Sequence, residues 1–363
     1  MISGPYATQL LGDQGADVIK VETEAGDLIR YATPARGGMS AAFLASNRSK
    51  RSITLDLKSD AGKAVLEKLI TTADVFVQNF RPGAIERMGF GEDHVRELKP
   101  DIVYVSISGF GETGPYTHKR VYDPVIQALS GCMHAQGRDG VPRFMNTILP
   151  DKLTAMTAAQ AITAALLGRE RTGVGEHVRL SMLDATVAWL WPDAMINDTL
   201  LGEGASAPLK TGQDNTAIET EDGFIVVFIA SDVEWLGFTR AAGEPELADD
   251  ARFTTLQDRM ANYSEMTEMI RAIVRTGTTK HWLARLDQEQ VPCAQVNTIE
   301  AVFEDEQILT NELICETEHA TAGRNRLPRP AARFSEHSID LDRPAPRLGQ
   351  HNEEILHELG LSE

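Results

Sequence analysis

Two runs of sequence decide the fold class: Ala73-Asp-Val-Phe-Val-Gln-Asn-Phe-Arg-Pro-Gly83 and Asp101-Ile-Val-Tyr-Val-Ser-Ile-Ser-Gly-Phe-Gly111. In each, β-branched and aromatic residues stand directly before a turn that contains glycine, as in a buried strand followed by a loop. The residues between them predict two short helices, one that ends at Met88 and one around 93–98. Strands that alternate with helices at this spacing predict an α/β fold with a mostly parallel sheet.

The same alternation extends in both directions along the chain. Further helices are predicted at 8–14, from Ser59 onward, over much of 232–289 and in the tail, and further strands at 16–22, 52–57, 224–230 and 291–296. Residues 177–185 predict a strand that enters a helix. Residues 313–334 predict a hairpin. We therefore expect a large Rossmann-like domain over 1–190, a linker over 191–221, a smaller α/β domain over 222–300, and a segment over 301–363 that returns to the large domain.

Composition excludes several classes of protein. The chain has 363 residues, is 42% hydrophobic and carries a formal net charge of −18, which disfavours nucleic acid and anionic lipid as partners. No apolar run approaches the roughly 18 residues of a membrane span, and no signal peptide is visible, so we expect a cytoplasmic protein. Three scattered cysteines predict no disulfide framework, and no spacing of His, Cys or acids predicts a metal site.

One carboxylate stands out at the start of an alanine-rich helical run. Pro150 and Asp151 precede the small residues of 155–168, and Asp is a preferred N-cap that the free N–H groups of a first turn keep ionised. An ionised carboxylate in this position is suited to nucleophilic attack. The residues alone leave two interpretations open, because Asp151 is either a structural cap or a nucleophile.

Basic residues and glycines gather in loops that follow the predicted strands. Ligands of parallel sheets bind at the carboxyl ends of the strands, and the loops at 47–51, 79–83 and 108–114 lie at or beside such ends. The cations of this set, which include Lys50, Arg51 and Arg87, are suited either to a phosphate-bearing ligand or to simple solvation. Tyr122 is a possible hydrogen-bond donor in the site. The chain contains neither a P-loop, nor a dinucleotide fingerprint, nor the nucleophile elbow of a serine hydrolase.

Many ordered stretches resemble the family III CoA-transferases, whose fold is shared with α-methylacyl-CoA racemase. The resemblance covers essentially the whole chain and rests on 4–13, 15–22, 47–56, 73–83, 87–90, 106–111, 168–176, 244–253, 291–297 and 348–353. It implies CoA transfer from an acyl-CoA to a carboxylic acid, with acyl-CoA as substrate and no tightly bound cofactor. It also implies an interlocked homodimer.

The resemblance also assigns residues. It implies that Asp151 attacks the thioester and forms first an aspartyl anhydride and then an aspartyl-CoA thioester. The positions that match the family's CoA site are Asn79, Phe80, Arg87, Met88 and Arg120, and we add Lys50 and Arg51 from the basic cluster.

Two alternatives remain at this stage. A 2-methylacyl-CoA racemase needs two acid/base groups and carries His where this chain has Tyr122, which favours the transferase. A catalytically inert acyl-CoA-binding protein is the other alternative, because members of the family usually open with one more strand.

Overall fold

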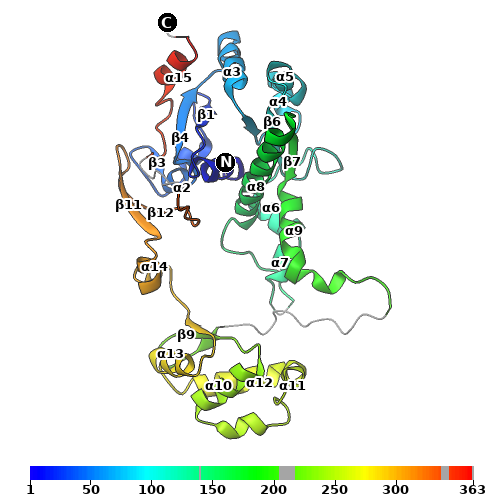
Figure 1. Cartoon of the computed structure of the whole chain (residues 1–363), viewed down its shortest axis with the longest axis vertical. Helices are drawn as coiled ribbons and strands as arrows, with labels where there is room; N and C mark the ends of the chain where they lie inside the picture. Colours follow the sequence, from blue (N-terminus) through cyan, green and yellow to red (C-terminus); the bar gives the residue numbers. More distant parts are fainter. Residues whose placement is uncertain (139, 204–216, 337–342, 362–363) are drawn as a thin grey trace. The chain divides into compact units, whose positions relative to one another are not determined.

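The computed structural model describes residues 1–138, 140–203, 217–336 and 343–361, and the chain divides into two units (Figure 1). The first unit comprises Met1–Ala207 with Glu312–Glu363, and the second comprises Pro208–Asn311. Part of the predicted linker, 204–216, lies outside the described residues. No helix among the described residues is long and apolar enough to cross a membrane.

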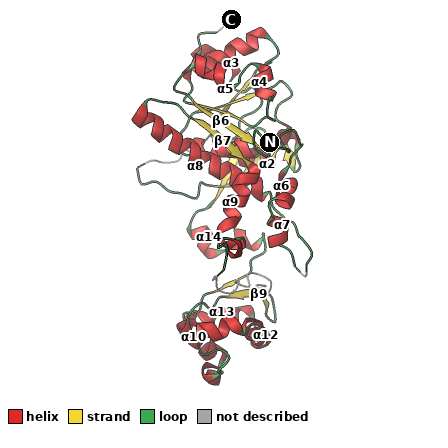
Figure 2. Ribbon diagram, turned by 90° about the vertical axis from the view of Figure 1, so that its right-hand side faces the viewer, coloured by secondary structure: helices red, strands yellow, loops and turns green. Residues whose placement is uncertain are grey.

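Parallel strands form the centre of the first unit (Figure 2). Strands β5 (Val75–Gln78), β6 (Val103–Ser108) and β7 (His177–Ser181) pair in parallel, and so do β1 (Val18–Glu22) and β4 (Lys50–Thr54). The predicted α/β fold with a parallel sheet is therefore confirmed. The helices that pack on these strands, or join them, are α1 (Ser3–Gly12), α2 (Ala41–Asn47), α3 (Asp60–Thr72), α4 (Ala84–Met88), α5 (Glu92–Leu98), α6 (Asp123–Leu129), α7 (Cys132–Ala135), α8 (Leu149–Thr172), α9 (Met182–Ala194) and α15 (Asn352–Glu358).

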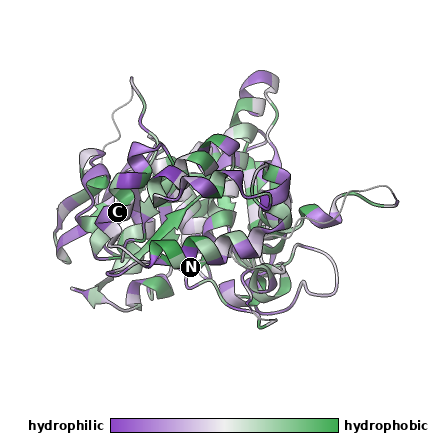
Figure 3. Cartoon of the chain, turned by 90° about the horizontal axis from the view of Figure 1, so that it is seen from below, coloured by the Kyte–Doolittle hydropathy of each residue, from purple (hydrophilic) through white to green (hydrophobic). Residues whose placement is uncertain are grey.

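Both faces of β6 are covered, and all six of its residues are buried. Val103 and Val105 pack in one core with small residues of α1 and α8, whereas Tyr104 packs in another core with α3 and α5. The apolar strands lie among helices of mixed hydropathy in Figure 3. Alanines such as Ala155 and Ala158 allow α8 to pack closely against the strands and against α1.

Helix α1 begins five residues earlier than the sequence predicted. Gly4-Pro5 resembles a turn, but a proline in the first helical turn lacks only an N–H group that has no partner within the helix. The early start matters for the site, because it places Ser3 at the first turn of α1, and α1 packs along α8.

The remaining strands pair in antiparallel fashion. In the first unit, β2 (Ala35–Arg36) pairs with β3 (Met39–Ser40), and the predicted hairpin is present as β11 (Ile314–His319) and β12 (Gly323–Pro328). The second unit has a three-stranded sheet of β8 (Ile218–Glu219), β9 (Phe224–Val227) and β10 (Cys293–Gln295). Its helices, which share a core that includes Trp235 and Phe238, are α10 (Asp232–Ala242), α11 (Leu256–Ala261), α12 (Tyr263–Val274) and α13 (Thr279–Gln288), and α14 (Glu306–Thr310) follows near its end.

Candidate active site

Asp151 is the third residue of α8, not its N-cap. The helix begins at Leu149, and the N-cap position is held by Ile148, whose side chain has no acceptor. The expectation that Asp151 caps the helix is therefore wrong, because Pro150 is accommodated inside the first turn instead of preceding the helix. As a result, the Asp151 carboxylate is not occupied by the N–H groups of its own helix.

The missing cap is supplied by another helix. Oδ2 of Asp123, the first residue of α6, accepts a hydrogen bond of 3.1 Å from the Asp151 N–H group. Asp123 is buried, and its Oδ1 accepts a hydrogen bond of 2.7 Å from Nε2 of Gln127, one turn further along α6. Neither residue was identified from the sequence, since Asp123-Pro124 indicates only that a helix begins there.

The Asp151 carboxylate is directed toward the start of α1. Its Oδ1 accepts a hydrogen bond of 3.2 Å from the Ser3 N–H group and a second, short one from the Ser3 hydroxyl. The residue is partly buried, and no Lys, Arg or His among the described residues forms an ion pair with it. Ser3 gave no signal in the sequence, because its helix was predicted to begin later.

The start of α1 also contacts one of the expected CoA-binding residues, Asn79. A Cβ atom added to Gly4 would lie 3.2 Å from the amide group of Asn79, so the two residues are in close contact and a side chain at position 4 would crowd Asn79. Asn79 and Phe80 follow β5 directly, and both are exposed. The carboxyl end of β5 and the nucleophile candidate therefore face the same short segment of backbone, as expected for a parallel sheet.

Two arginines near this edge carry free charges. Arg87 lies with Met88 in α4, and Arg120 lies shortly before α6; both arginines are exposed, and neither forms an ion pair within the described residues. Tyr122 is the N-cap residue of α6, next to Asp123, and its side chain is 61% exposed. Its hydroxyl has no hydrogen-bond partner among the described residues.

The other two predicted cations are engaged with the protein itself. The Lys50 ammonium is buried and donates to the carbonyl of Pro5 at 2.6 Å, to Asn47 Oδ1 at 2.9 Å and to the carbonyl of Ser46 at 3.1 Å. Burial holds the pKa of Lys50 well below its usual value. Lys50 thus binds the first turn of α1 through the Pro5 carbonyl.

Arg51 is engaged at the surface. Its guanidinium forms ion pairs with Asp17, Glu354 and Glu358, the last two from α15. Arg51 therefore connects the edge of the first unit to the C-terminal helix, and its charge is shared among three carboxylates. The structure does not bring Arg51 together with Asp151, Asn79 and the exposed arginines.

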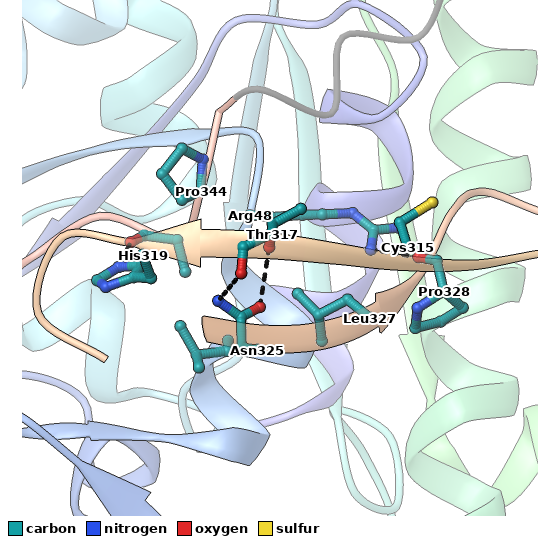
Figure 4. A pocket seen from close by; sticks show the side chains of 10 residues that line it. Arg48, Cys315, Thr317, His319, Asn325, Leu327, Pro328 and Pro344 are labelled. Carbon is teal, nitrogen blue, oxygen red and sulfur yellow. Dashed lines mark hydrogen bonds between the residues drawn. The ribbon is translucent and has the colours of Figure 1, made fainter. Parts of the chain in front are cut away.

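A separate pocket lies beneath the β11–β12 hairpin (Figure 4). Its polar side chains already have partners: Arg48 pairs with Asp13, His319 Nε2 contacts the carbonyl of Ala345, and Thr317 and Asn325 hydrogen-bond to each other. These four side chains are therefore already bonded to other groups of the described chain. The start of α8, where several polar groups meet around an unpaired carboxylate, is the stronger candidate for an active site.

The comparisons with known proteins identify the family and the fold of the chain. Residues 1–352 match CoA-transferase family III. The chain is 35% identical to the succinyl-CoA:glutarate CoA-transferase of Mus musculus, covering 99% of this chain and 84% of that one. It is 34% identical to the formyl-CoA:oxalate CoA-transferase of Streptomyces coelicolor, covering 99% and 93%.

A solved structure shares the whole architecture. The crystal structure of a CAIB/BAIF family protein from Brucella suis has a TM-score of 0.83 and 31% identity, covering 99% of this chain and 96% of that one. The match of the family over nearly the whole chain, the full-length relatives and the common fold lead to one conclusion: this chain belongs to CoA-transferase family III and is an enzyme of the CoA-transferase class.

Proposed function

We propose that the protein transfers CoA from an acyl-CoA donor to a carboxylic acid acceptor, with Asp151 as the nucleophile. The observation that carries this proposal is the state of the Asp151 carboxylate. It lies in the first turn of α8, it neither caps that helix nor pairs with a cation of the described chain, and two donors of Ser3 hold one of its oxygens. The relatives named above catalyse CoA transfer according to their names, which supports the same chemistry here.

The first half of the reaction moves CoA onto the enzyme. The free oxygen of Asp151 attacks the thioester carbonyl, the carbon–sulfur bond breaks, and CoA leaves as the thiolate. The product is a mixed anhydride between Asp151 and the acyl group. The thiolate then attacks the Asp151 carbonyl of this anhydride, the donor acid leaves as its carboxylate, and Asp151 carries CoA as a thioester.

The second half reverses these steps with another acid. The acceptor carboxylate attacks the aspartyl thioester, expels the thiolate and forms a second anhydride. Attack of the thiolate on the acyl carbonyl of the acceptor gives the new acyl-CoA and restores the Asp151 carboxylate. Each tetrahedral intermediate carries a negative charge on oxygen, and the free hydroxyl of Tyr122 is our candidate donor to it.

The substrate thioester is placed along the edge formed by β5 and α4. We propose that Asn79, Phe80 and Met88 line the CoA site and that the exposed Arg87 and Arg120 bind its phosphates. Lys50 stabilises the start of α1 through its hydrogen bond to the Pro5 carbonyl, and Arg51 holds α15 through its ion pair with Glu354. CoA is bound as a substrate in this proposal, and no resident cofactor takes part.

Two features of the architecture belong to the same proposal. We describe the first unit as Rossmann-like, with helices on both faces of its parallel strands. We also propose a homodimer, because α8 and α9 expose large apolar side chains, with Met156, Leu167 and Trp189 being 60%, 52% and 49% exposed. Sedimentation velocity tests this point, since a single 39.7 kDa species would contradict it.

The proposed nucleophile is tested by trapping. The enzyme is incubated with succinyl-CoA, acetyl-CoA or formyl-CoA, treated with hydroxylamine, and mapped by mass spectrometry. We expect a hydroxamate at Asp151 that is absent in Asp151→Asn. Asp184→Asn is the matched control, because Asp184 is likewise the third residue of its helix, α9, but lies at the surface with its N–H group bonded to Ser181.

Transfer is then measured with glutarate or oxalate as acceptor. Formation of the acceptor's CoA thioester by the wild type and the Asp184→Asn variant, but not by Asp151→Asn, supports the proposal. Exchange of the C2 proton of a 2-methylacyl-CoA in D2O, without transfer and without a label at Asp151, would instead indicate racemase chemistry.

A further inference from the structure

The peptide that carries Asp151 is held by a buried side chain from another helix. Asp123 is 3% exposed and lies at the start of α6, 28 residues before the nitrogen that it binds. Because Ile148 offers no acceptor, Asp123 performs at α8 the role that a local Ser, Thr or Asp performs at most helix starts.

Gln127 extends this connection to the segment that leads into α8. Its Nε2 donates to Asp123 at 2.7 Å and to the carbonyl of Thr147 at 3.1 Å, while its Oε1 accepts from the Met145 N–H group at 3.0 Å. Gln127 is 2% exposed. The two side chains thus connect α6 with three backbone points between 145 and 151, and this network leaves little freedom to the start of α8.

We propose that Asp123, supported by Gln127, is a positioning residue that orients Asp151 for acylation. The inference rests on the proposed function of Asp151. A nucleophile must approach the thioester carbon along a narrow range of directions, and a displacement of about 1 Å costs about 100-fold in rate. The side chain of Asp151 moves with its backbone. The hydrogen bond from the Asp151 N–H group to Asp123 therefore also restricts the position of the attacking carboxylate oxygen.

The negative charge of Asp123 also favours acylation of Asp151. Burial raises the pKa of Asp123; hydrogen bonds from Gln127 and from the Asp151 N–H group oppose this shift, and the nearby Asp151 carboxylate adds to it. Lys152 lowers the pKa by its positive charge, and the thiol of Cys132 also faces Asp123. When Asp151 is acylated it becomes neutral, and the repulsion between the two carboxylates disappears. An ionised Asp123 therefore favours the acyl-enzyme over the free enzyme.

The test compares single-turnover acylation of Asp151 in Asp123→Asn and in a capping control. Asparagine preserves the size and one acceptor oxygen of Asp123 but removes the charge. Ser59→Ala removes the Ser59 cap of α3, which accepts from the Gly62 N–H group and belongs to a helix on the other face of the sheet. Asp123→Asn loses one of the two hydrogen bonds that Asp123 accepts, and Ser59→Ala loses the cap of α3, so a purely structural effect would lower their melting temperatures similarly.

We expect hydroxamate formation at Asp151 to slow at least tenfold in Asp123→Asn, equivalent to about 1.4 kcal/mol. The affinity for CoA should remain within about twofold of the wild type, and Ser59→Ala should acylate at the wild-type rate. Acylation of Asp123→Asn at the wild-type rate would overturn the inference, as would a loss of CoA affinity equal to the loss of rate. A wild type that acylates no Asp151 would overturn the proposed function itself.

Gln127→Ala provides a second route if Asp123→Asn does not fold. It leaves the Asp123 carboxylate in place but releases the backbone at 145 and 147. We expect a slower acylation of Asp151 with CoA affinity unchanged. Wild-type acylation by a folded Gln127→Ala variant would contradict the role of the network.

Discussion

Substitution of Lys50 by methionine is expected to weaken folding and to leave CoA binding intact. The buried ammonium donates to three acceptors, the carbonyls of Pro5 and Ser46 and the side chain of Asn47. Leaving a buried acceptor without its donor costs about 1–3 kcal/mol. Methionine also avoids the burial of a charge, which costs several kcal/mol. Because these terms partly cancel, we expect the free energy of unfolding to fall by about 2–3 kcal/mol.

Urea denaturation and calorimetric titration with CoA separate the two roles of Lys50. Lys58→Met is the matched control, because Lys58 is exposed, belongs to the same basic region and should lose less than about 0.5 kcal/mol. A Lys50→Met variant with wild-type stability and a CoA affinity reduced tenfold or more would refute the structural role. Lys50 would then be a phosphate ligand, as its place in the basic cluster suggested.

The pH dependence gives an independent measurement of the same effect. The pKa of Lys50 is lowered by burial, so in the interval between its folded and unfolded values the folded chain binds fewer protons. Its contribution to stability is therefore complete above the unfolded pKa of about 10.4 and is lost as pH falls through the folded pKa. The destabilisation caused by Lys50→Met should thus be larger at about pH 10 than at about pH 7. An equal destabilisation at both values would contradict the buried environment.

Three further substitutions give separate tests. Glu22→Gln leaves the buried Arg30 without its bidentate partner and should cost about 3–5 kcal/mol in urea denaturation at neutral pH. Burial alone would raise the pKa of Glu22, but the hydrogen bonds and charges of Arg30 and its other partners outweigh burial and lower the pKa below its usual value. The stabilisation by Glu22 is therefore present above pH 4.5 and lost as pH falls, and the variant should lack this acid-dependent loss. Arg87→Gln should raise the KM for acyl-CoA about tenfold without changing the melting temperature, because Arg87 has no ion pair to lose. Gly109→Ala places a Cβ 2.3 Å from Val121 Cγ1 and should destabilise the fold by about 1–3 kcal/mol. The rate of CoA transfer should also fall, because Tyr122 of the proposed site directly follows Val121.

The strands and most helices of the first unit are predictable from the sequence because their signals are local. The apolar run of β6 and the cap of α3 by Ser59 depend on residues within a few positions of each other. The start of α8 is different, because its acceptor comes from Asp123 in another helix. No local pattern contains that partner, so the sequence instead predicts Asp151 as the cap.

The basic run at 48–51 shows the same limit for charge. Its cations predict an anion site if only the neighbouring sequence is considered. In the folded chain Arg48 pairs with Asp13, Lys50 is enclosed by backbone, and Arg51 meets three carboxylates. With 53 acids against 35 Lys and Arg residues, an arginine near the core readily finds an internal partner. The exposed Arg87, which lacks one, is the better candidate for a ligand.

Two similarly placed carboxylates, in α8 and α9, differ in their surroundings, and only the one in α8 is our candidate nucleophile. Asp151 and Asp184 are each the third residue of a helix, and each has its N–H group bonded to a side-chain oxygen. In α9 the acceptor is the adjacent Ser181, and Asp184 is left in solvent. In α8 the acceptor is a buried residue of α6, and the carboxylate is directed against Ser3 of α1.

The position in a helix is thus shared by both residues, whereas the enclosure by two further helices is specific to Asp151. An enclosed and oriented carboxylate loses less solvation and less conformational entropy on reaching the transition state than a freely rotating one. A helix-terminal acid therefore becomes a plausible nucleophile when its capping role is performed by another residue, and α6 performs that role here.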